Sequence, residues 1–273
     1  MDEKSKVIRA ALVVVFVLAV VSAAYYLFIA GKAADRGGGP PPAPVPKPAA
    51  GEASGGEAAP APVLNAPLDG SDEGVRGLAA DLSSNPVFAR WLKSKDLLRR
   101  FAAAVDNIAG GQSPRPQADF FAPAAEFKVL MKGGETFVDP SGYDRYNVIA
   151  DVLDSISTAG CARFYSGVRP LLQRAYRELG YPNGDFHQTL LRAIVEILRT
   201  PVTDEPVALE KGVASWILVD PRLEELSPAQ KHLFRMGPEN LQLVQAKLRE
   251  IALALGFGEA QLPRPRVYTS GKK

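Results

Sequence analysis

Residues 168–201 constrain the fold most, because they have the pattern of two amphipathic helices joined by a short turn. They read VRPLLQRAYRELGYPNGDFHQTLLRAIVEILRTP. Apolar residues at helical spacing define one stripe on each helix. The first stripe comprises Val168, Leu171, Leu172, Ala175, Tyr176 and Leu179, and the second comprises Phe186, Leu190, Leu191, Ile194, Val195 and Leu198. The helices are predicted to lie antiparallel with both stripes in a shared core, which includes Leu172, Leu179, Leu191 and Ile194.

The residues between and after the two stripes carry the expected boundary signals. Gly180 follows the first stripe, where a helix commonly ends at positive φ. Residues 182–185, Pro-Asn-Gly-Asp, form a turn sequence, and Asn183 or Asp185 can cap the second helix. Pro201 is expected to end it. This hairpin predicts a scaffold but no chemistry.

An uncharged apolar run, AALVVVFVLAVVSAAYYLFIA, occupies residues 10–30. About 20 such residues span a bilayer as a helix, so we predict an uncleaved transmembrane anchor. One alternative is a cleaved signal peptide with a site at residues 22–24, but Tyr25 and the residues after it continue the apolar run. The other alternative is a buried core helix, which the N-terminal position before a linker disfavours.

Basic residues before the run favour a cytoplasmic N-terminus and an exported C-terminal part. The expected organisation is a cytoplasmic tail over residues 1–9, the anchor over 10–30, and a linker over 31–67. The linker is rich in Pro, Ala and Gly and cannot bury enough apolar surface to fold. The expected location is a bacterial inner membrane, single-pass, with the C-terminal domain in the periplasm.

The remaining sequence predicts a mainly α, multi-helix globular domain over residues 68–258 with one or two short β-hairpins, and a flexible tail over 259–273. Ser71 and Ser94 are predicted helix caps, and Ser227 with Gln230 forms a capping-box pattern. A helix is predicted to start at Asp139-Pro140 and to break near Gly160. One hairpin is expected over residues 127–138, and a second between residues 207–209 and 216–219.

The residues with reactive side chains do not form a catalytic or metal-binding motif. The sequence contains no P-loop, no Gly-x-Ser-x-Gly and no His-Glu-x-x-His. Cys161, the single cysteine, lies on an apolar helical face and is interpreted as a buried, inert thiol. His187 is interpreted as a helix residue and not as a metal ligand. We therefore predict no catalytic residues, no metal and no cofactor, and the net charge of +2 gives no reason to expect nucleic acid.

A mixed aromatic and polar set is the candidate recognition groove for a peptide, a glycan or a partner helix. Structural roles in caps, ion pairs and the core are the competing interpretation, and it is favoured because charges on helices are commonly solvated. The set comprises Tyr143, Arg145, Tyr146, Arg174, Tyr176, Glu178, Tyr181, Arg235, Glu239 and Asn240.

Four segments together resemble an uncharacterised bacterial family, domain-of-unknown-function family 3014. They are LLRRFAAAVDNI at 97–108, DPSGYDRYN at 139–147, AYRELGYPNGDF at 175–186 and LSPAQKHLFRMGPEN at 226–240. The resemblance covers roughly residues 68–255 and implies a membrane-anchored envelope protein with an N-terminal anchor, a Pro/Ala linker and one domain. It implies no enzymatic activity and supplies no functional residues.

The expected function is a non-catalytic interaction or scaffold domain in the bacterial envelope. Its expected partners are the lipid bilayer, through the N-terminal helix, and another envelope protein or a cell-wall polymer. The alternative is an enzyme acting on a cell-wall or glycan substrate with a carboxylate such as Asp106, Glu178 or Asp185. A carboxylate pair of suitable separation in a cleft would favour this alternative.

Overall fold

The computed structural model describes residues 63–117, 125–213 and 215–270, all in one compact unit that extends from Ala58 to Lys273. The predicted cytoplasmic tail, the apolar run and most of the linker lie outside these residues. Among the described helices, none is long and apolar enough to cross a membrane. Leu64, which the sequence assigned to the linker, packs against the helical core. Its amide donates a hydrogen bond to the Gly167 carbonyl (3.0 Å).

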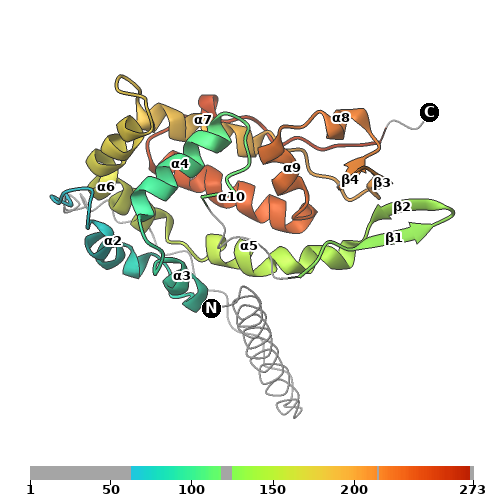
Figure 1. Ribbon diagram of the computed structural model, residues 1–273, viewed down its shortest axis with the longest axis horizontal. Coiled ribbons are helices and arrows are strands. Elements are labelled where there is room, and N and C mark those ends of the chain that lie inside the picture. Colours follow the sequence, from blue (N-terminus) through green and yellow to red (C-terminus); the bar gives the residue numbers. More distant parts are fainter. Residues whose placement is uncertain (1–62, 118–124, 214, 271–273) are drawn as a thin grey trace, which may run out of the picture. The chain divides into compact units, whose positions relative to one another are not determined.

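The described residues confirm the prediction of a mainly helical domain (Figure 1). Short 3₁₀ helices occur at Ala80–Leu82 (η1), Pro140–Tyr146 (η3) and Glu259–Gln261 (η4). The α-helices are α2 (Asp72–Ala79), α3 (Pro86–Trp91), α4 (Leu97–Ala109), α5 (Asn147–Asp154), α6 (Thr158–Glu178), α7 (Phe186–Leu198), α8 (Pro221–Glu224), α9 (Pro228–Phe234) and α10 (Pro238–Ala254).

The predicted helical hairpin is α6 and α7, joined through the turn at residues 182–185. Asp185 caps α7 by accepting from the His187 amide (2.7 Å). The sequence had left Asn183 and Asp185 as alternative caps. The expected break before this helix exists but lies at residues 155–157 and not at Gly160, because α6 starts at Thr158 and the Ser157 hydroxyl caps it by accepting from the Gly160 amide (3.1 Å). Gly160 therefore belongs to the first turn of the helix and does not interrupt it.

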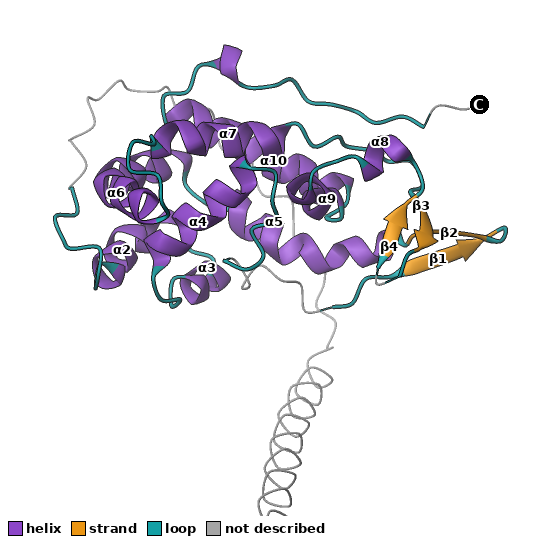
Figure 2. Cartoon of the chain, turned by 45° about the horizontal axis from the view of Figure 1, so that its top comes forward, coloured by secondary structure: helices purple, strands orange, loops and turns teal. Residues whose placement is uncertain are grey.

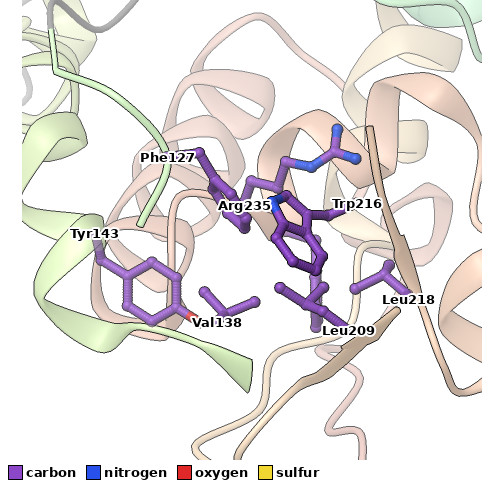
Figure 3. Close-up of a pocket in the computed structure, with 8 residues that line it drawn as sticks. Phe127, Val138, Tyr143, Leu209, Trp216, Leu218 and Arg235 are labelled. Atoms are coloured by element: carbon purple, nitrogen blue, oxygen red, sulfur yellow. The ribbon is translucent and has the colours of Figure 1, made fainter. Parts of the chain in front are cut away.

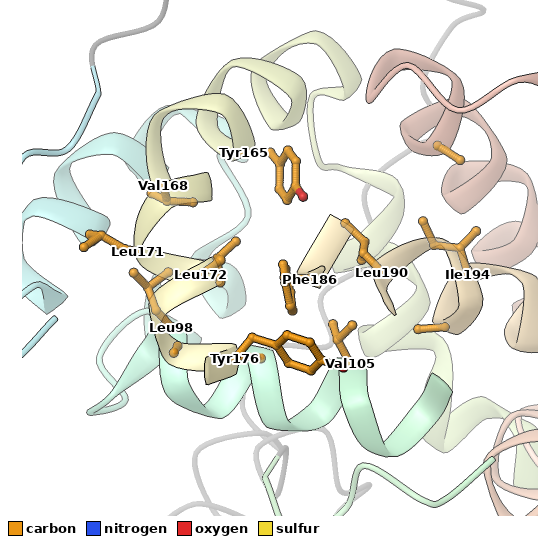
Figure 4. Close-up of a cluster of buried hydrophobic side chains, with 14 of the residues drawn as sticks. Leu98, Val105, Tyr165, Val168, Leu171, Leu172, Tyr176, Phe186, Leu190 and Ile194 are labelled. Atoms are coloured by element: carbon orange, nitrogen blue, oxygen red, sulfur yellow. The ribbon is translucent and has the colours of Figure 1, made fainter. Parts of the chain in front are cut away.

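The main core lies between α4, α6 and α7 (Figure 4). Leu172 and Ile194 are buried as predicted, and Leu191 packs partly buried against this core. The prediction that Leu179 lies in the core is wrong, because its side chain is 41% exposed. It stands one residue after the end of α6, where the chain turns away, so helical spacing no longer determines the side it faces.

Two predicted serine caps are also wrong. Ser71 is buried at the start of α2 but its side chain makes no capping hydrogen bond. Helix α4 begins at Leu97 after Asp96 and not after Ser94. The carboxylate of Asp72, in the first turn of α2, instead accepts from the amides of Asp96 and Leu97, both at 2.9 Å. A side chain distant in sequence thus caps α4, which local patterns cannot reveal.

The two predicted hairpins both form, and they join into one antiparallel sheet in the order β1-β2-β3-β4 (Figure 2). The strands are β1 (Val129–Lys132), β2 (Glu135–Val138), β3 (Ala208–Lys211) and β4 (Trp216–Leu218). Strands β2 and β3 pair through Thr136 with Leu209 and Phe137 with Ala208. One face of the sheet packs on α8 and α9 around Val138, Leu209, Leu218, Leu223 and Phe234.

The segment predicted as a flexible tail contacts the domain as far as Ser270. Val202 pairs with Val267 in an isolated parallel bridge. The Tyr268 hydroxyl donates to Asp220 (2.5 Å), whose carboxylate also pairs with Arg222 (2.7 Å). These two bonds hold the pKa of Asp220 far below its usual range, with Arg222 as the larger cause.

Candidate functional site

A groove of about 690 Å³ lies between the sheet and the N-terminal end of α10. The sheet wall carries Leu130, Lys132, Glu135 and Phe137, and residues 203–207 continue it toward β3. The helical wall comprises Tyr143, Asp144, Asn147, Met236, Gly237, Glu239 and Asn240. This volume lies in the range of about 300–1,000 Å³ that is usual for ligand sites.

The pairing of β1 with β2 determines which side chains face the groove. Leu130 pairs with Phe137 and Lys132 with Glu135, and residues paired across an antiparallel ladder project from the same face. Their neighbours on the opposite face, including Val138 and Val129, belong to the core under the sheet. Period-two alternation therefore places Leu130, Lys132, Glu135 and Phe137 on the groove face, whereas Val138, at the end of β2, contacts both the groove and the core.

The helical wall begins with a capped 3₁₀ helix. The carboxylate of Asp139 accepts from the Ser141 amide (2.9 Å), and Pro140 occupies the first position of η3. Tyr143 on this helix packs against Gly237, which has φ 83°. A Cβ atom at Gly237 would overlap the ring of Tyr143, so only glycine permits this approach.

Asn240 joins the parts of this wall by hydrogen bonds. Its Nδ2 lies 3.2 Å from the Tyr143 carbonyl oxygen, 3.0 Å from Oδ1 of Asn147 and 3.0 Å from the Met236 carbonyl oxygen. The two hydrogens of this buried amide are thus shared among acceptors in η3, in α5 and in the turn before α10. The network fixes the relative position of these segments, because each acceptor would lose its partner if they separated.

The groove carries an excess of negative charge. Its lining includes one lysine, Lys132, and five carboxylates, which belong to Glu135, Asp144, Asp204, Glu205 and Glu239. Within the described part of the chain, no ion pair engages Asp204 or Glu239. Leu130, Phe137 and Tyr143 supply apolar surface beside these carboxylates, whereas Met236 and Val207 are largely buried in the lining.

A second, much smaller cavity of about 20 Å³ lies inside the sheet core (Figure 3). Tyr143, Val138, Leu209 and Trp216 are among its lining residues. Burial raises the pKa of Tyr143, because the ionised form of its hydroxyl would lose hydration there. The cavity has room for about one water molecule and is therefore part of the packed core rather than a ligand site.

Six of the ten predicted site residues lie in or near the groove and the small cavity. Tyr143, Glu239 and Asn240 line the groove, and Arg235 lines the small cavity. Tyr146 is buried in a separate apolar cluster. The guanidinium group of Arg145 lies over the rings of Phe127 (5.3 Å) and Tyr146 (4.8 Å), so this residue packs aromatic side chains together.

The other four residues lie at the C-terminal end of α6 and its turn, and none lines the groove. Tyr176 is buried, accepts a hydrogen bond from Oγ1 of Thr189 (3.0 Å) and stacks on Tyr181. The Tyr181 hydroxyl donates to Asp106 (3.1 Å), and Glu178 pairs with Arg99 (2.7 Å). Arg174 is exposed on α6. These contacts match the competing structural interpretation better than a recognition role.

The carboxylates named for an enzymatic alternative have structural partners. Asp106 accepts from Tyr181 and Asp185 caps α7. The hydrogen bond from Arg99 lowers the pKa of Glu178, which is opposite to the direction that a general acid at neutral pH requires.

The two other reactive residues lie in helical packing. Cys161 is partly buried on α6, and burial raises the pKa of its thiol, which disfavours the reactive thiolate. Nδ1 of His187 lies 2.9 Å from the Tyr165 hydroxyl, and its ring stacks on Phe257. Among the described residues, no three His, Cys, Asp or Glu side chains gather as a metal site.

Sequence reasoning did not identify the sheet wall or residues 203–207 as part of a site. Asp204 and Glu205 precede Pro206 in a stretch without periodicity, which gave no signal beyond its polarity. Their place in the groove depends on the pairing of β2 with β3, between residues more than 60 positions apart. The pattern of either hairpin alone does not reveal this pairing.

Comparison with known proteins gives one family. No curated protein and no solved structure matches the chain. A family model described as "Protein of unknown function (DUF3014)" matches residues 97–252, which is more than half of the 273 residues and includes every element that builds the groove. The chain therefore belongs to this family of proteins of unknown function.

Proposed function

We propose that the protein is a non-catalytic interaction module that binds a partner in the groove between the sheet and α10. The groove itself is the observation that carries this proposal. It combines about 690 Å³ of space with apolar side chains and several carboxylates, the mixture expected of a recognition site.

The construction of the helical wall supports a binding role. The Asn240 hydrogen bonds and the Tyr143–Gly237 contact hold η3, α5 and α10 in one arrangement before any partner arrives. A preformed site loses less conformational entropy on binding than one that must first be ordered. Two of the segments that carry the family resemblance, residues 139–147 and 226–240, meet at this wall.

The proposal includes a membrane tether. The apolar run over residues 10–30 has the length and composition of a spanning helix, and basic residues precede it. The linker, which begins at residue 31 and ends before Leu64 packs on the domain, would hold the domain away from the bilayer. We infer from this organisation a periplasmic domain in a bacterium, whose partner is another envelope protein or a cell-wall polymer.

Site-specific photo-crosslinking in intact cells tests the proposal. A photoreactive amino acid replaces Lys132, which is exposed and lines the groove, or Lys95, which is exposed and does not line it. We expect a discrete, saturable adduct from position 132 and none from position 95. Equal adducts from both positions, or no adduct from position 132, would exclude the groove as the binding site.

A further inference from the structure

The charge of the groove restricts what can occupy it. Five carboxylates line it, against Lys132, and Asp204 and Glu239 have no ion-pair partner among the described residues. Like charges repel, so anionic ligands such as phosphates, acidic glycans and anionic lipid headgroups are disfavoured, most strongly at low ionic strength because most of these carboxylates are exposed to solvent. A cationic ligand would neutralise the excess.

The apolar surface of the groove restricts the ligand further. Leu130 and Phe137 lie beside the carboxylates, and Tyr143 presents an aromatic ring. Lysine and arginine side chains suit this arrangement, because their hydrocarbon stems cover apolar surface while the charged end reaches a carboxylate. Aromatic rings also attract such cations. A small inorganic cation would not use the apolar part at all.

From these observations we propose that the occupant is a short, extended peptide segment of a partner protein that carries lysine or arginine at alternate positions. Alternation suits the site because side chains of an extended peptide project to opposite sides, so that every second residue meets the same wall. This inference rests on the proposed function of the groove and specifies the chemistry of its partner.

The C-terminal lysines of the chain are the alternative occupant that a test must exclude. The Ser270 amide donates to Oε2 of Glu205 (2.6 Å), a residue of the groove lining, and the sequence ends in Gly-Lys-Lys. A test of the proposal must therefore distinguish between two occupants: a peptide that belongs to another protein, and the C-terminal lysines of this chain.

Fluorescence anisotropy with the full-length protein in nanodiscs provides that test. The probes are labelled peptides Lys-Val-Lys-Val-Lys, Gln-Val-Gln-Val-Gln and Glu-Val-Glu-Val-Glu. We expect the lysine peptide to bind at least tenfold more tightly than the other two, with an affinity that falls as ionic strength rises. Equal affinity for the lysine and glutamine peptides would overturn the proposal.

Matched variants assign the effect to the groove. The double variant Asp204→Asn/Glu239→Gln removes two carboxylates of the lining and should weaken lysine-peptide binding at least tenfold. The double variant Glu210→Gln/Glu225→Gln removes two exposed carboxylates outside the lining and should change it less than twofold. Equal weakening by both would show that the peptide responds only to net charge, and the proposal would fail.

Two further outcomes are decisive. Deletion of residues 271–273 should leave the affinity unchanged, whereas a gain of tenfold or more would identify the chain's own C-terminus as the occupant and overturn the proposal. If the Lys132 photo-crosslink forms but the lysine peptide does not bind, the groove remains an interaction site and only the inference about its partner fails.

Discussion

Gly237 determines how closely the chain before α10 approaches η3. Its φ of 83° and ψ of 165° lie in a region that is essentially restricted to glycine, and the Tyr143 ring occupies the position that a side chain would need. Gly237→Ala should therefore lower the free energy of unfolding by roughly 2–5 kcal/mol, through backbone strain and overpacking together. Urea denaturation measures this change.

Gly180→Ala is the control for the backbone component alone. Gly180 also has positive φ (105°), but no atom lies within 4 Å of the position that a Cβ atom would take there, so only the strain of about 1–2 kcal/mol remains. If both variants lost the same stability, the contact between Tyr143 and Gly237 would not contribute to the wall of the groove.

His187 makes stability depend on pH. Burial first, and then the charge of Arg169, lower its pKa, whereas Asp185 acts in the opposite direction. The folded-state pKa lies below the unfolded value of about 6.5, so the stabilising contribution is complete above that value and is lost as pH falls through it. His187→Gln should flatten the decrease in the urea midpoint between about pH 7 and 5.5, and identical slopes would contradict this account. His232, whose pKa burial also lowers, remains in both proteins and accounts for a residual slope.

At the scale of elements, Leu172 and Leu179 form a matched pair on one predicted stripe. Leu172 is 1% exposed in the main core and Leu179 is 41% exposed beyond the end of α6. Leu172→Ala should cost about 2–5 kcal/mol of unfolding free energy, the range for large aliphatic deletions in packed cores. Leu179→Ala should cost less than about 1 kcal/mol, as is usual at exposed positions. Equal losses in thermal or urea unfolding would show that Leu179 is also part of the core.

Local signals were sufficient to predict most elements. Asp185 and the capping box of Ser227 and Gln230 act as the sequence indicates. Short apolar runs, the first pair joined through Gly133-Gly134, located both hairpins. The failures occurred where a distant residue replaces a local one. Asp72 caps α4 in place of Ser94, and the end of α6 turns Leu179 out of its stripe. Helical spacing predicts a face only as far as the helix continues.

At the scale of the whole molecule, long-range pairing could not be predicted from the sequence. Tyr143, Glu239 and Asn240 lie together at the groove, whereas Arg174, Tyr176, Glu178 and Tyr181 lie on α6 and its turn and do not line it. The opposite wall depends on the β2–β3 pairing, for which neither strand carries a specific signal. The site therefore follows from tertiary structure that joins segments of ordinary composition.

The most direct test of partner binding compares these two groups of residues by the same substitution. Glu239→Trp places a large side chain at the rim of the groove, whereas Arg174→Trp places one on the exposed surface of α6. Both positions are exposed, so both variants should melt within a few degrees of the unaltered protein.

The measurement is the yield of the Lys132 photo-crosslink in intact cells. We predict that Glu239→Trp reduces the yield at least tenfold because it blocks the groove, and that Arg174→Trp leaves it within twofold. An unchanged yield with Glu239→Trp, or a loss that only Arg174→Trp causes, would contradict the assignment of partner binding to the groove.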